Sequence, residues 1–472
     1  MSLLLALPRF VAIKTSISTN SKYLRYMNED DKVRGFFQFS EDEILRTPYT
    51  KFELQYPKTG DADDLVHIRC CYNNKYLVRS SAEDDWIVGA ADEPEEDKSK
   101  WSCTLFQLLS SHHTTNGYTL RHVQTGFFVQ TESFQSHPHC LSILPVGDID
   151  IQLVDMDTLV TLPMYIAFKG DNGKYLRAHM VNNHEYNQFA ADDIGGKVAR
   201  YQVFPLYDGR VRIKSLQYDK FWRRSPNWIW SDSRDSTNNN KDTLFMPVKV
   251  ASKVIALRNL GNNLFCKRLT TEGNTNCLNA GTSEITREAQ LEVVDTVLRR
   301  EIYNVTFQIE DGRRYNMTTV DSITKDVTNK NSTETVGDVS FSYTETRSNT
   351  WNKSNSWSLG VSVDMTTDIP FIGETGITIE GSYSGEYSWG ESLETSKELS
   401  TSETVTTPPM TRSIVTMLVQ RGTIDIPFTY DQRDTLYDGT TEITRQVDGI
   451  FTGVNTFVKF DISYESLLEE EI

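Results

Sequence analysis

Asn73-Asn74-Lys75-Tyr76-Leu77-Val78-Arg79 is the clearest copy of a sequence phrase that decides how the first two thirds of this 472-residue chain fold. The phrase joins a small or polar turn, a lysine, an aromatic residue and an apolar strand. Asparagine and glycine tolerate a positive φ at little cost, so each copy is expected to form a β-hairpin. The aromatic residues that anchor the six copies are Tyr23, Tyr76, Phe127, Tyr175, Phe221 and Phe265.

The spacing of these aromatic residues, 44 to 53 positions, fits two all-β architectures. A six-bladed propeller would use four strands per copy and close as one ring. Two β-trefoils would instead use three copies each and close as two separate barrels. Residues 155–163 interrupt the repeat with an acidic stretch that ends in proline. We therefore favour two trefoils, at residues 1–155 and 163–296.

The last third of the chain has a different composition. Residues 1–298 carry 34 Lys/Arg and 37 Asp/Glu, whereas residues 299–472 carry 14 and 28, a net charge of -14. Residues 392–407 contain nine Ser/Thr in sixteen, which by itself would fit disorder. Strand-like alternation, for example in residues 457–462, favours long threonine-rich strands instead. We expect a third β-domain at residues 300–465.

The sharpest pattern in this domain is an alternation of apolar and small polar residues in two arms between residues 356 and 389. Period two places the two sets on opposite faces of a β-ribbon, and about ten residues per arm suits a tilted transmembrane strand. Ile369, Phe371 and Ile372 form an apolar tip between the arms. The other residues of the predicted insertion hairpin are Trp357, Leu359, Val361, Val363, Met365, Ile377, Ile379 and Trp389.

The opposite face of this hairpin carries small polar residues with Asp364, Glu380 and Glu386, which are predicted to line a water-filled lumen. A half-buried hairpin of a soluble β-sandwich would show the same alternation, so the pattern alone leaves both interpretations open. The hairpin has no lysine or arginine, which a solvent-exposed strand usually carries, and this favours membrane insertion. Trp357 would then lie opposite Tyr387 and Trp389, as an aromatic girdle at the bilayer interface.

The repeat region resembles the amaranthin-type plant lectins over about residues 1–297. The resemblance implies two tandem β-trefoils, head-to-tail dimerisation, and binding of galactose- and N-acetylgalactosamine-type glycans, including the T-disaccharide. It implies no enzymatic role. The matching stretches are Tyr23-Leu24-Arg25-Tyr26, Asn74-Lys75-Tyr76-Leu77-Val78-Arg79, Glu93-Pro94 with Trp101-Ser102-Cys103-Thr104-Leu105-Phe106, Gly173-Lys174-Tyr175-Leu176 and Asn227-Trp228-Ile229.

A sugar site needs an aromatic face for the C–H side of the ring and polar groups for its hydroxyls. The resemblance places the first trefoil's part of this site in the loop before Trp86, which is more acidic here than in the family. The second trefoil of a partner subunit would supply the other part. Trp86 and Trp228 also fit core positions, whereas Trp222, inside a repeated strand, is expected in the core. The predicted carbohydrate-binding residues are Glu83, Asp84, Asp85, Trp86, Asn227, Trp228 and Trp230.

The last third resembles the aerolysin-type β-pore-forming toxins over about residues 300–465. The resemblance rests on the Ser/Thr-rich strands and on the amphipathic hairpin with Asp368-Ile369-Pro370-Phe371-Ile372-Gly373 at its tip. It implies an elongated β-sheet domain that oligomerises and inserts one hairpin per subunit into a closed barrel, because lipid cannot satisfy an open sheet edge. The expected fold is all-β: two tandem β-trefoil domains followed by this aerolysin-like domain.

Several other function classes are disfavoured. A net charge of -17 without a Lys/Arg block argues against nucleic acid. Cysteine and histidine lie before residue 278 without zinc-type spacing, and phosphate loops and nucleophile elbows are missing, so we expect no enzyme, metal or cofactor. Without a basic n-region or a long apolar run, we expect a cytoplasmic protein that is soluble until membrane insertion.

Two functions remain from the sequence. The first is a carbohydrate-binding lectin whose C-terminal module oligomerises and forms a transmembrane β-barrel pore, with a role in plant defence. The alternative is a non-lytic cytosolic glycan-binding stress lectin whose aerolysin-like region serves only for oligomerisation. Both predict glycans and further copies of this chain as partners, and only the first predicts a membrane.

Overall fold

The computed structural model describes the chain apart from residues 1–6, 16–20, 59–63, 112–113, 115, 134–136, 146–148, 355–361 and 468–472. The regular structure of the described residues is β-strand with short 3-10 helices, which confirms the all-β class. No helix in this part of the chain is long and apolar enough to cross a membrane. The 3-10 helices are η1 (Pro48–Thr50), η2 (Lys197–Ala199), η3 (Lys241–Thr243), η4 (Arg287–Ala289) and η5 (Ile309–Asp311).

The chain divides into two compact units. The first comprises Met1–Ile302, Ser354–Asp364 and Asp431–Asp448. The second comprises Tyr303–Lys353, Met365–Tyr430 and Gly449–Ile472.

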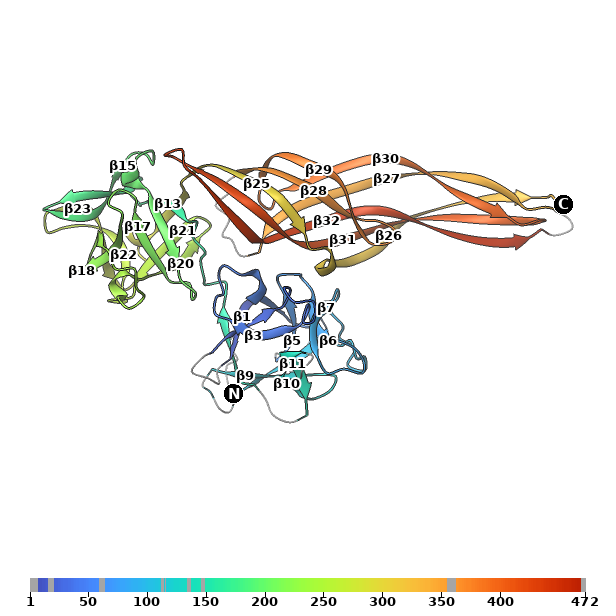
Figure 1. The fold of residues 1–472 in the computed structure, drawn as a ribbon, viewed down its shortest axis with the longest axis horizontal. Helices are drawn as coiled ribbons and strands as arrows, with labels where there is room; N and C mark the ends of the chain where they lie inside the picture. The colour runs from blue at the N-terminus through green and yellow to red at the C-terminus, as the bar shows by residue number, and fades with distance from the viewer. Residues whose placement is uncertain are drawn as a thin grey trace. The chain divides into compact units, whose positions relative to one another are not determined.

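The first triplet of repeats forms a closed barrel with three capping hairpins (Figure 1). Strands β1, β4, β5, β8, β9 and β12 pair in that order, and β12 returns to pair with β1, so the barrel has no open edge. The hairpins β2–β3, β6–β7 and β10–β11 complete a β-trefoil. The strands are β1 (Phe10–Thr15), β2 (Tyr23–Tyr26), β3 (Phe37–Glu41), β4 (Phe52–Gln55), β5 (Leu65–Cys70), β6 (Tyr76–Arg79), β7 (Ile87–Ala91), β8 (Leu105–Ser110), β9 (Tyr118–His122), β10 (Phe128–Ser133), β11 (Pro138–Leu144) and β12 (Ile151–Asp155).

The second triplet repeats the same topology. Strands β13, β16, β17, β20, β21 and β24 pair in order, and β24 closes the barrel on β13. Because each triplet closes on itself, the chain forms two trefoils and not one six-bladed ring. The strands are β13 (Tyr165–Lys169), β14 (Tyr175–Val181), β15 (His184–Ala191), β16 (Tyr201–Pro205), β17 (Val211–Ser215), β18 (Lys220–Ser225), β19 (Trp228–Ser233), β20 (Phe245–Ala251), β21 (Val254–Asn259), β22 (Phe265–Thr271), β23 (Asn274–Thr282) and β24 (Leu291–Asp295).

The repeated phrase forms a tight turn followed by a β-bulge. Asn74, Gly173, Asp219 and Asn263 adopt positive φ two residues before an anchoring aromatic residue, as predicted for hairpin turns. In the third copy Gly126 has φ +72°, so Phe128 takes the aromatic position and the prediction of Phe127, which is exposed, was one residue off. Bulges occur at Tyr23/Leu24, Tyr76/Leu77, Tyr175/Leu176, Phe221/Arg223 and Phe265/Cys266.

Each trefoil has its own hydrophobic core. The second core is built around Trp222, which is fully buried, with ring centroids 5.0 Å from Tyr201, 5.5 Å from Phe168 and 5.9 Å from Phe245. The predicted core position of Trp222 is therefore confirmed.

The six cysteines are buried and none forms a disulfide. Burial raises the pKa of the Cys71 and Cys277 thiols to about 11, so very little reactive thiolate is present near neutral pH.

The last third forms one sheet of eight long strands in the order β29-β28-β25-β31-β32-β27-β30, with β26 paired to β31. Strand β27 pairs with β32 only from Arg347 to Lys353. Beyond that stretch the β27–β30 ribbon packs on β26, β31 and β32 through a small core that includes Phe341 and Met417. The strands are β25 (Val297–Phe307), β26 (Arg313–Asn329), β27 (Thr335–Lys353), β28 (Ser362–Ile372), β29 (Ile377–Ser388), β30 (Ser392–Thr407), β31 (Thr411–Leu436) and β32 (Thr441–Ser466).

The two closed barrels lead to a first prediction, that residues 1–297 fold without the rest of the chain. The fragment would lose peripheral contacts such as the 2.5 Å hydrogen bond between the Tyr165 hydroxyl and Glu442, worth about 1 kcal/mol. We expect a soluble fragment with β-type circular dichroism and cooperative thermal unfolding. An insoluble or unfolded fragment would show that the domain boundary is wrong.

Candidate functional site

Trp86 lies in an aromatic cluster to which all three capping hairpins of the first trefoil contribute. Its half-buried ring lies 6.2 Å from Phe36 and 5.1 Å from His137, and the rings of Phe36 and His137 stack at 4.3 Å. Phe36 precedes β3 and His137 precedes β11, so residues about fifty positions apart meet at one end of the barrel. Sequence reasoning missed Phe36 and His137, because neither belongs to the repeated phrase. We name these three residues the first aromatic cluster.

The acidic loop before Trp86 is held by Arg79, which is only 8% exposed. The Arg79 guanidinium donates to the backbone oxygens of Ala82 and Asp84 and to the Asp85 carboxylate at 3.1 to 3.3 Å. The Glu83, Asp84 and Asp85 side chains are exposed, and Asp84 also accepts from Ser81 at 3.2 Å. The loop therefore presents carboxylates on a fixed backbone beside the first aromatic cluster.

The second trefoil has a corresponding cluster. Trp228 is 5% exposed, and its indole N–H donates to Glu272 at 3.2 Å. The Trp230 ring stacks on His184 at 4.1 Å with an interplanar angle of 10°, and Tyr186 lies about 5.6 Å from both tryptophans. We name His184, Tyr186, Trp228 and Trp230 the second aromatic cluster. The burial of Trp228 favours a packing role, and His184 covers one face of Trp230.

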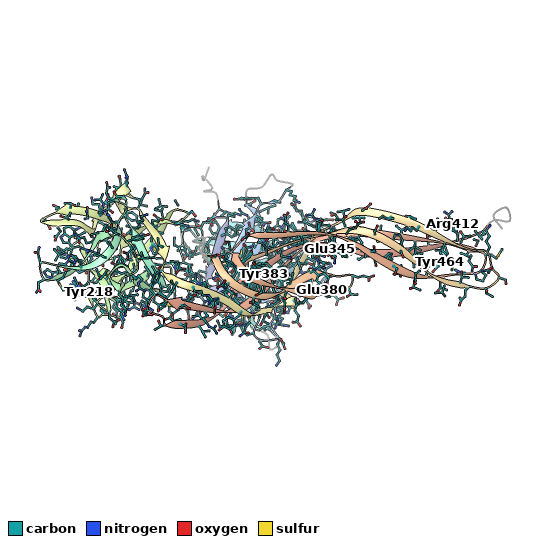
Figure 2. The ribbon with its side chains drawn as sticks, turned by 90° about the horizontal axis from the view of Figure 1, so that it is seen from above. Tyr218, Glu345, Glu380, Tyr383, Arg412 and Tyr464 are labelled. Atoms are coloured by element: carbon teal, nitrogen blue, oxygen red, sulfur yellow. The ribbon has the colours of Figure 1, made fainter. Side chains whose placement is uncertain are left out.

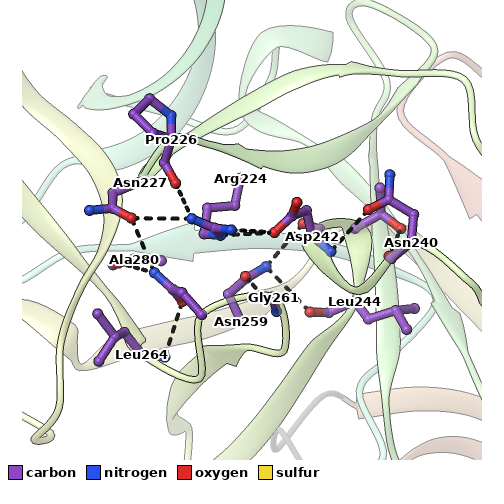
Figure 3. A network of polar contacts seen from close by, with 12 residues as sticks. Arg224, Pro226, Asn227, Asn240, Asp242, Leu244, Asn259, Gly261, Leu264 and Ala280 are labelled. Carbon is purple, nitrogen blue, oxygen red and sulfur yellow. Dashed lines mark hydrogen bonds and ion pairs between the residues drawn. The ribbon is translucent and has the colours of Figure 1, made fainter.

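Asn227 is part of a polar network at the turn between β18 and β19 (Figure 3). Its side-chain oxygen accepts from Arg224 at 3.3 Å and from Asn262 at 3.2 Å. The same Arg224 forms a salt bridge with Asp242, the residue that Asn240 caps at the start of η3. This network fixes the turn that leads into the second aromatic cluster, so Asn227 has a structural role, and its part in glycan binding stays a prediction.

The predicted insertion hairpin corresponds to β28 and β29, at one end of the sheet order. Trp357, Leu359 and Val361 lie outside the described residues. On β28, Val363, Met365 and Thr367 are buried while Thr366 and Asp368 are exposed, in agreement with the predicted alternation. The buried positions then shift to the even residues Pro370 and Ile372, with Ile369 and Phe371 half-buried.

The second arm of the hairpin is more exposed than the first. Ile377 is half-buried, and Ile379 is 48% exposed although it is a large aliphatic residue. Glu380 and Tyr383 extend from the same strand (Figure 2). Glu386 is also exposed, as expected for the polar set, and Asp364 forms a 2.8 Å salt bridge with Arg299.

The two aromatic residues at the end of β29 pack within the sheet. The Tyr387 hydroxyl accepts a 2.8 Å hydrogen bond from the backbone N–H of Trp351. The Trp389 ring lies 5.6 Å from Tyr430, with the Lys353 ammonium 4.6 Å from its centre. A role for these residues in a membrane girdle requires the hairpin to leave this packing.

Within the described part of the chain, no three His, Cys, Asp or Glu side chains form a group that could hold a metal ion.

Two families match different parts of the chain. The Agglutinin domain family matches residues 5–147 and 160–295. The family described as Clostridium epsilon toxin ETX/Bacillus mosquitocidal toxin MTX2 matches residues 271–464. None of the curated proteins compared with the chain matches it.

The similar solved structures have low identity. A mosquitocidal holotoxin is 9% identical with a TM-score of 0.29, and the match covers 65% of this chain and 36% of the holotoxin. The lamprey immune protein is 13% identical with a TM-score of 0.27, covering 64% of this chain and 91% of that protein. The designed three-fold symmetric protein ThreeFoil is 13% identical with a TM-score of 0.24, covering 28% of this chain and 99% of that one.

Proposed function

Because the chain belongs to the agglutinin family and its two trefoils are followed by an ETX/MTX2 aerolysin-like pore-forming toxin domain, we propose that it is a glycan-guided pore former. The trefoils concentrate the protein on a glycan-bearing surface. The last domain then oligomerises, and each subunit contributes one hairpin to a closed transmembrane barrel. A lectin of this kind would serve in plant defence.

The observation that carries this proposal is the position of the amphipathic hairpin. Strands β28 and β29 connect β27 to β30. Strands β27 and β30 pair with each other up to Thr350 opposite Ser392. The hairpin therefore connects the ends of two strands, β27 and β30, that are already paired with each other. Strand β29 is the outermost strand, with one side free of a partner in the sheet order of the described residues. Its release would break pairing on one side only.

The exposed aliphatic side chain of Ile379 supports the same conclusion. A solvent-facing isoleucine on an edge strand adds little to the stability of the soluble sheet, and an exposed edge strand invites pairing with other chains. In a barrel it would contact lipid. Glu380, its neighbour of opposite parity, would face the lumen, where rings of acidic side chains attract cations.

For the glycan we propose the galactose- and N-acetylgalactosamine-type sugars, including the T-disaccharide, that the family resemblance implies. The first aromatic cluster and the carboxylates of residues 83–85 supply the two groups that a sugar site needs, an aromatic surface and hydrogen-bond acceptors. The second aromatic cluster of a partner subunit, with Asn227 at its edge, would complete the site.

We predict that Trp86→Ala weakens glycan binding by about 1–3 kcal/mol, or about 5- to 150-fold in Kd, taking base–aromatic stacking as the analogue. Trp101→Ala is the matched control, because Trp101 is 42% exposed and belongs to neither aromatic cluster. Isothermal titration with the T-disaccharide measures both variants, and thermal unfolding checks the fold. Unchanged binding in Trp86→Ala would exclude the first cluster as a sugar site.

We also predict opposite effects for two adjacent residues of β29. Ile379→Lys places a charge on the lipid face at a cost of about 2–4 kcal/mol in each subunit, so it should abolish conductance in planar bilayers. Glu380→Ser should still conduct, with weaker cation preference. Both side chains are exposed in the structure, so the soluble fold should survive either change.

Two results would contradict this assignment of faces. If Ile379→Lys conducts normally and Glu380→Ser does not, the lipid and lumen faces are exchanged. If the unmodified protein never conducts while it binds glycan, the chain is the non-lytic lectin.

A further inference from the structure

The ladder between β27 and β30 is long and regular. It runs through sixteen consecutive residue pairs, from Thr335 opposite Thr407 to Thr350 opposite Ser392, without a bulge. If the same register continued into the hairpin, Val363 would face Ile379 and Asp368 would face Glu374. The turn would then fall at Phe371. We call this arrangement the continued register.

The hairpin of the structure has a different register. The side-chain oxygens of Thr366 and Ser384 lie 3.3 Å apart, whereas the continued register would place Thr366 opposite Gly376. The turn is closed by a 2.7 Å hydrogen bond from the Gly373 N–H to the Gly376 carbonyl. The turn of the structure therefore lies about four residues beyond the turn of the continued register.

The observed register does not keep the apolar residues on one face. At the turn, the odd-numbered Gly373 bonds to the even-numbered Gly376. Further along the hairpin, the two residues in contact, Thr366 and Ser384, both have even numbers. The phase therefore changes along β29, where Gly381 adopts φ +80°, the conformation of a bulge. On β28 the buried set also shifts from the odd residues up to Thr367 to the even residues Pro370 and Ile372.

The continued register removes these irregularities. All of its pairs join residues of the same parity, so Val363, Met365, Ile377 and Ile379 fall on one face, which a membrane strand needs. It also moves Pro370 from the interior of a central strand, where proline cannot donate to the ladder, into the turn, where proline is favoured.

One buried side chain holds the observed register. The Asn455 amide of β32 accepts from the Ile372 N–H at 2.8 Å and donates to the Ile372 carbonyl at 2.9 Å. Asn455 is 3% exposed and Ile372 is 1% exposed, so both backbone groups would be left unsatisfied in the core without this amide. Arg347 adds contacts to the same hairpin, 4.8 Å from the Phe371 ring and 3.5 Å from Glu380.

We propose that the hairpin changes register when it leaves the sheet: the Asn455–Ile372 contact opens, the turn moves from Gly373–Gly376 to the residues around Phe371, and the β27–β30 ladder continues to the tip. This inference rests on the proposed pore formation, and it assigns to Asn455 the role of a latch. The single apolar face arises only in the continued register. The register change therefore avoids the insertion of an arm that carries apolar residues on both faces.

Pairs of introduced cysteines distinguish the two registers. Thr366→Cys with Ser384→Cys should cross-link in the soluble protein, and Asp368→Cys with Glu374→Cys should cross-link only in the membrane-bound oligomer. Thr366→Cys with Glu380→Cys is the control, because these positions are four residues out of step in either register. The native thiols all precede residue 278, so peptide mass spectrometry separates their products from those of the hairpin.

Dye release from glycan-bearing liposomes is measured on the same samples. Oxidised Thr366→Cys/Ser384→Cys protein should release no dye, and a reductant should restore release. If the oxidised protein releases dye, or if dye-releasing oligomers never form the Asp368→Cys/Glu374→Cys cross-link, the register change is wrong and the pore stands. If the unmodified protein releases no dye and only the soluble cross-link forms, both proposals fail.

The latch has its own test in the soluble protein. Asn455→Ala should accelerate hydrogen exchange of the β28 and β29 amides and speed dye release. Asn329→Ala is the matched control, because Asn329 is equally buried and also donates to backbone carbonyls, those of Thr333, Thr407 and Pro408, but does not touch the hairpin. Equal effects of the two substitutions would show that Asn455 stabilises the fold in general and is not a latch.

Discussion

The backbone groups at every strand edge need hydrogen-bond partners. The two trefoils and the last domain meet this requirement in different ways. In the trefoils, β12 closes on β1 and β24 closes on β13, so neither barrel leaves an edge for another chain. In the last third, β29 and β30 end the sheet order of the described residues. Water can satisfy these edges but lipid cannot, so membrane insertion demands a closed barrel of several copies. The same constraint lets each trefoil close as an independent barrel.

Much of the fold could be predicted because it depends on local chemistry that recurs. The turns at Asn74 and Gly173 need residues that tolerate positive φ, and the aromatic residue after each turn marks a bulge. The repeat could therefore be recognised from the sequence. The first aromatic cluster was not predictable in full, because His137 meets Trp86 only through the three-fold arrangement of hairpins. The sequence left both a core position and a site role open for Trp228, because its N–H partner, Glu272, lies 44 residues away.

The hairpin shows how a pattern of alternating residues in the sequence can differ from the burial that the structure shows. Strict alternation describes the faces that a membrane strand needs, whereas the soluble sheet buries Met365 and Ile372, which have opposite parity. The soluble fold accepts this mismatch because Asn455 satisfies the backbone of Ile372 and Arg347 covers Phe371. In the proposed pore this alternation would set the lipid and lumen faces, whereas the structure shows the hairpin packed in the sheet. Glu380 and Glu386, two of the acidic residues in 299–472, are exposed in the structure and would face water in the proposed lumen.

In the proposed function, glycan binding by the trefoils directs pore formation by the last domain. Dye release by the full chain from liposomes with and without a T-disaccharide glycolipid tests this claim most directly. We predict release from the glycan-bearing liposomes, inhibition by free disaccharide, and little release from bare liposomes at the same protein concentration. Binding to the glycan-bearing liposomes without any release of dye would contradict the account, and equal release from both kinds of liposome would separate the pore from the lectin.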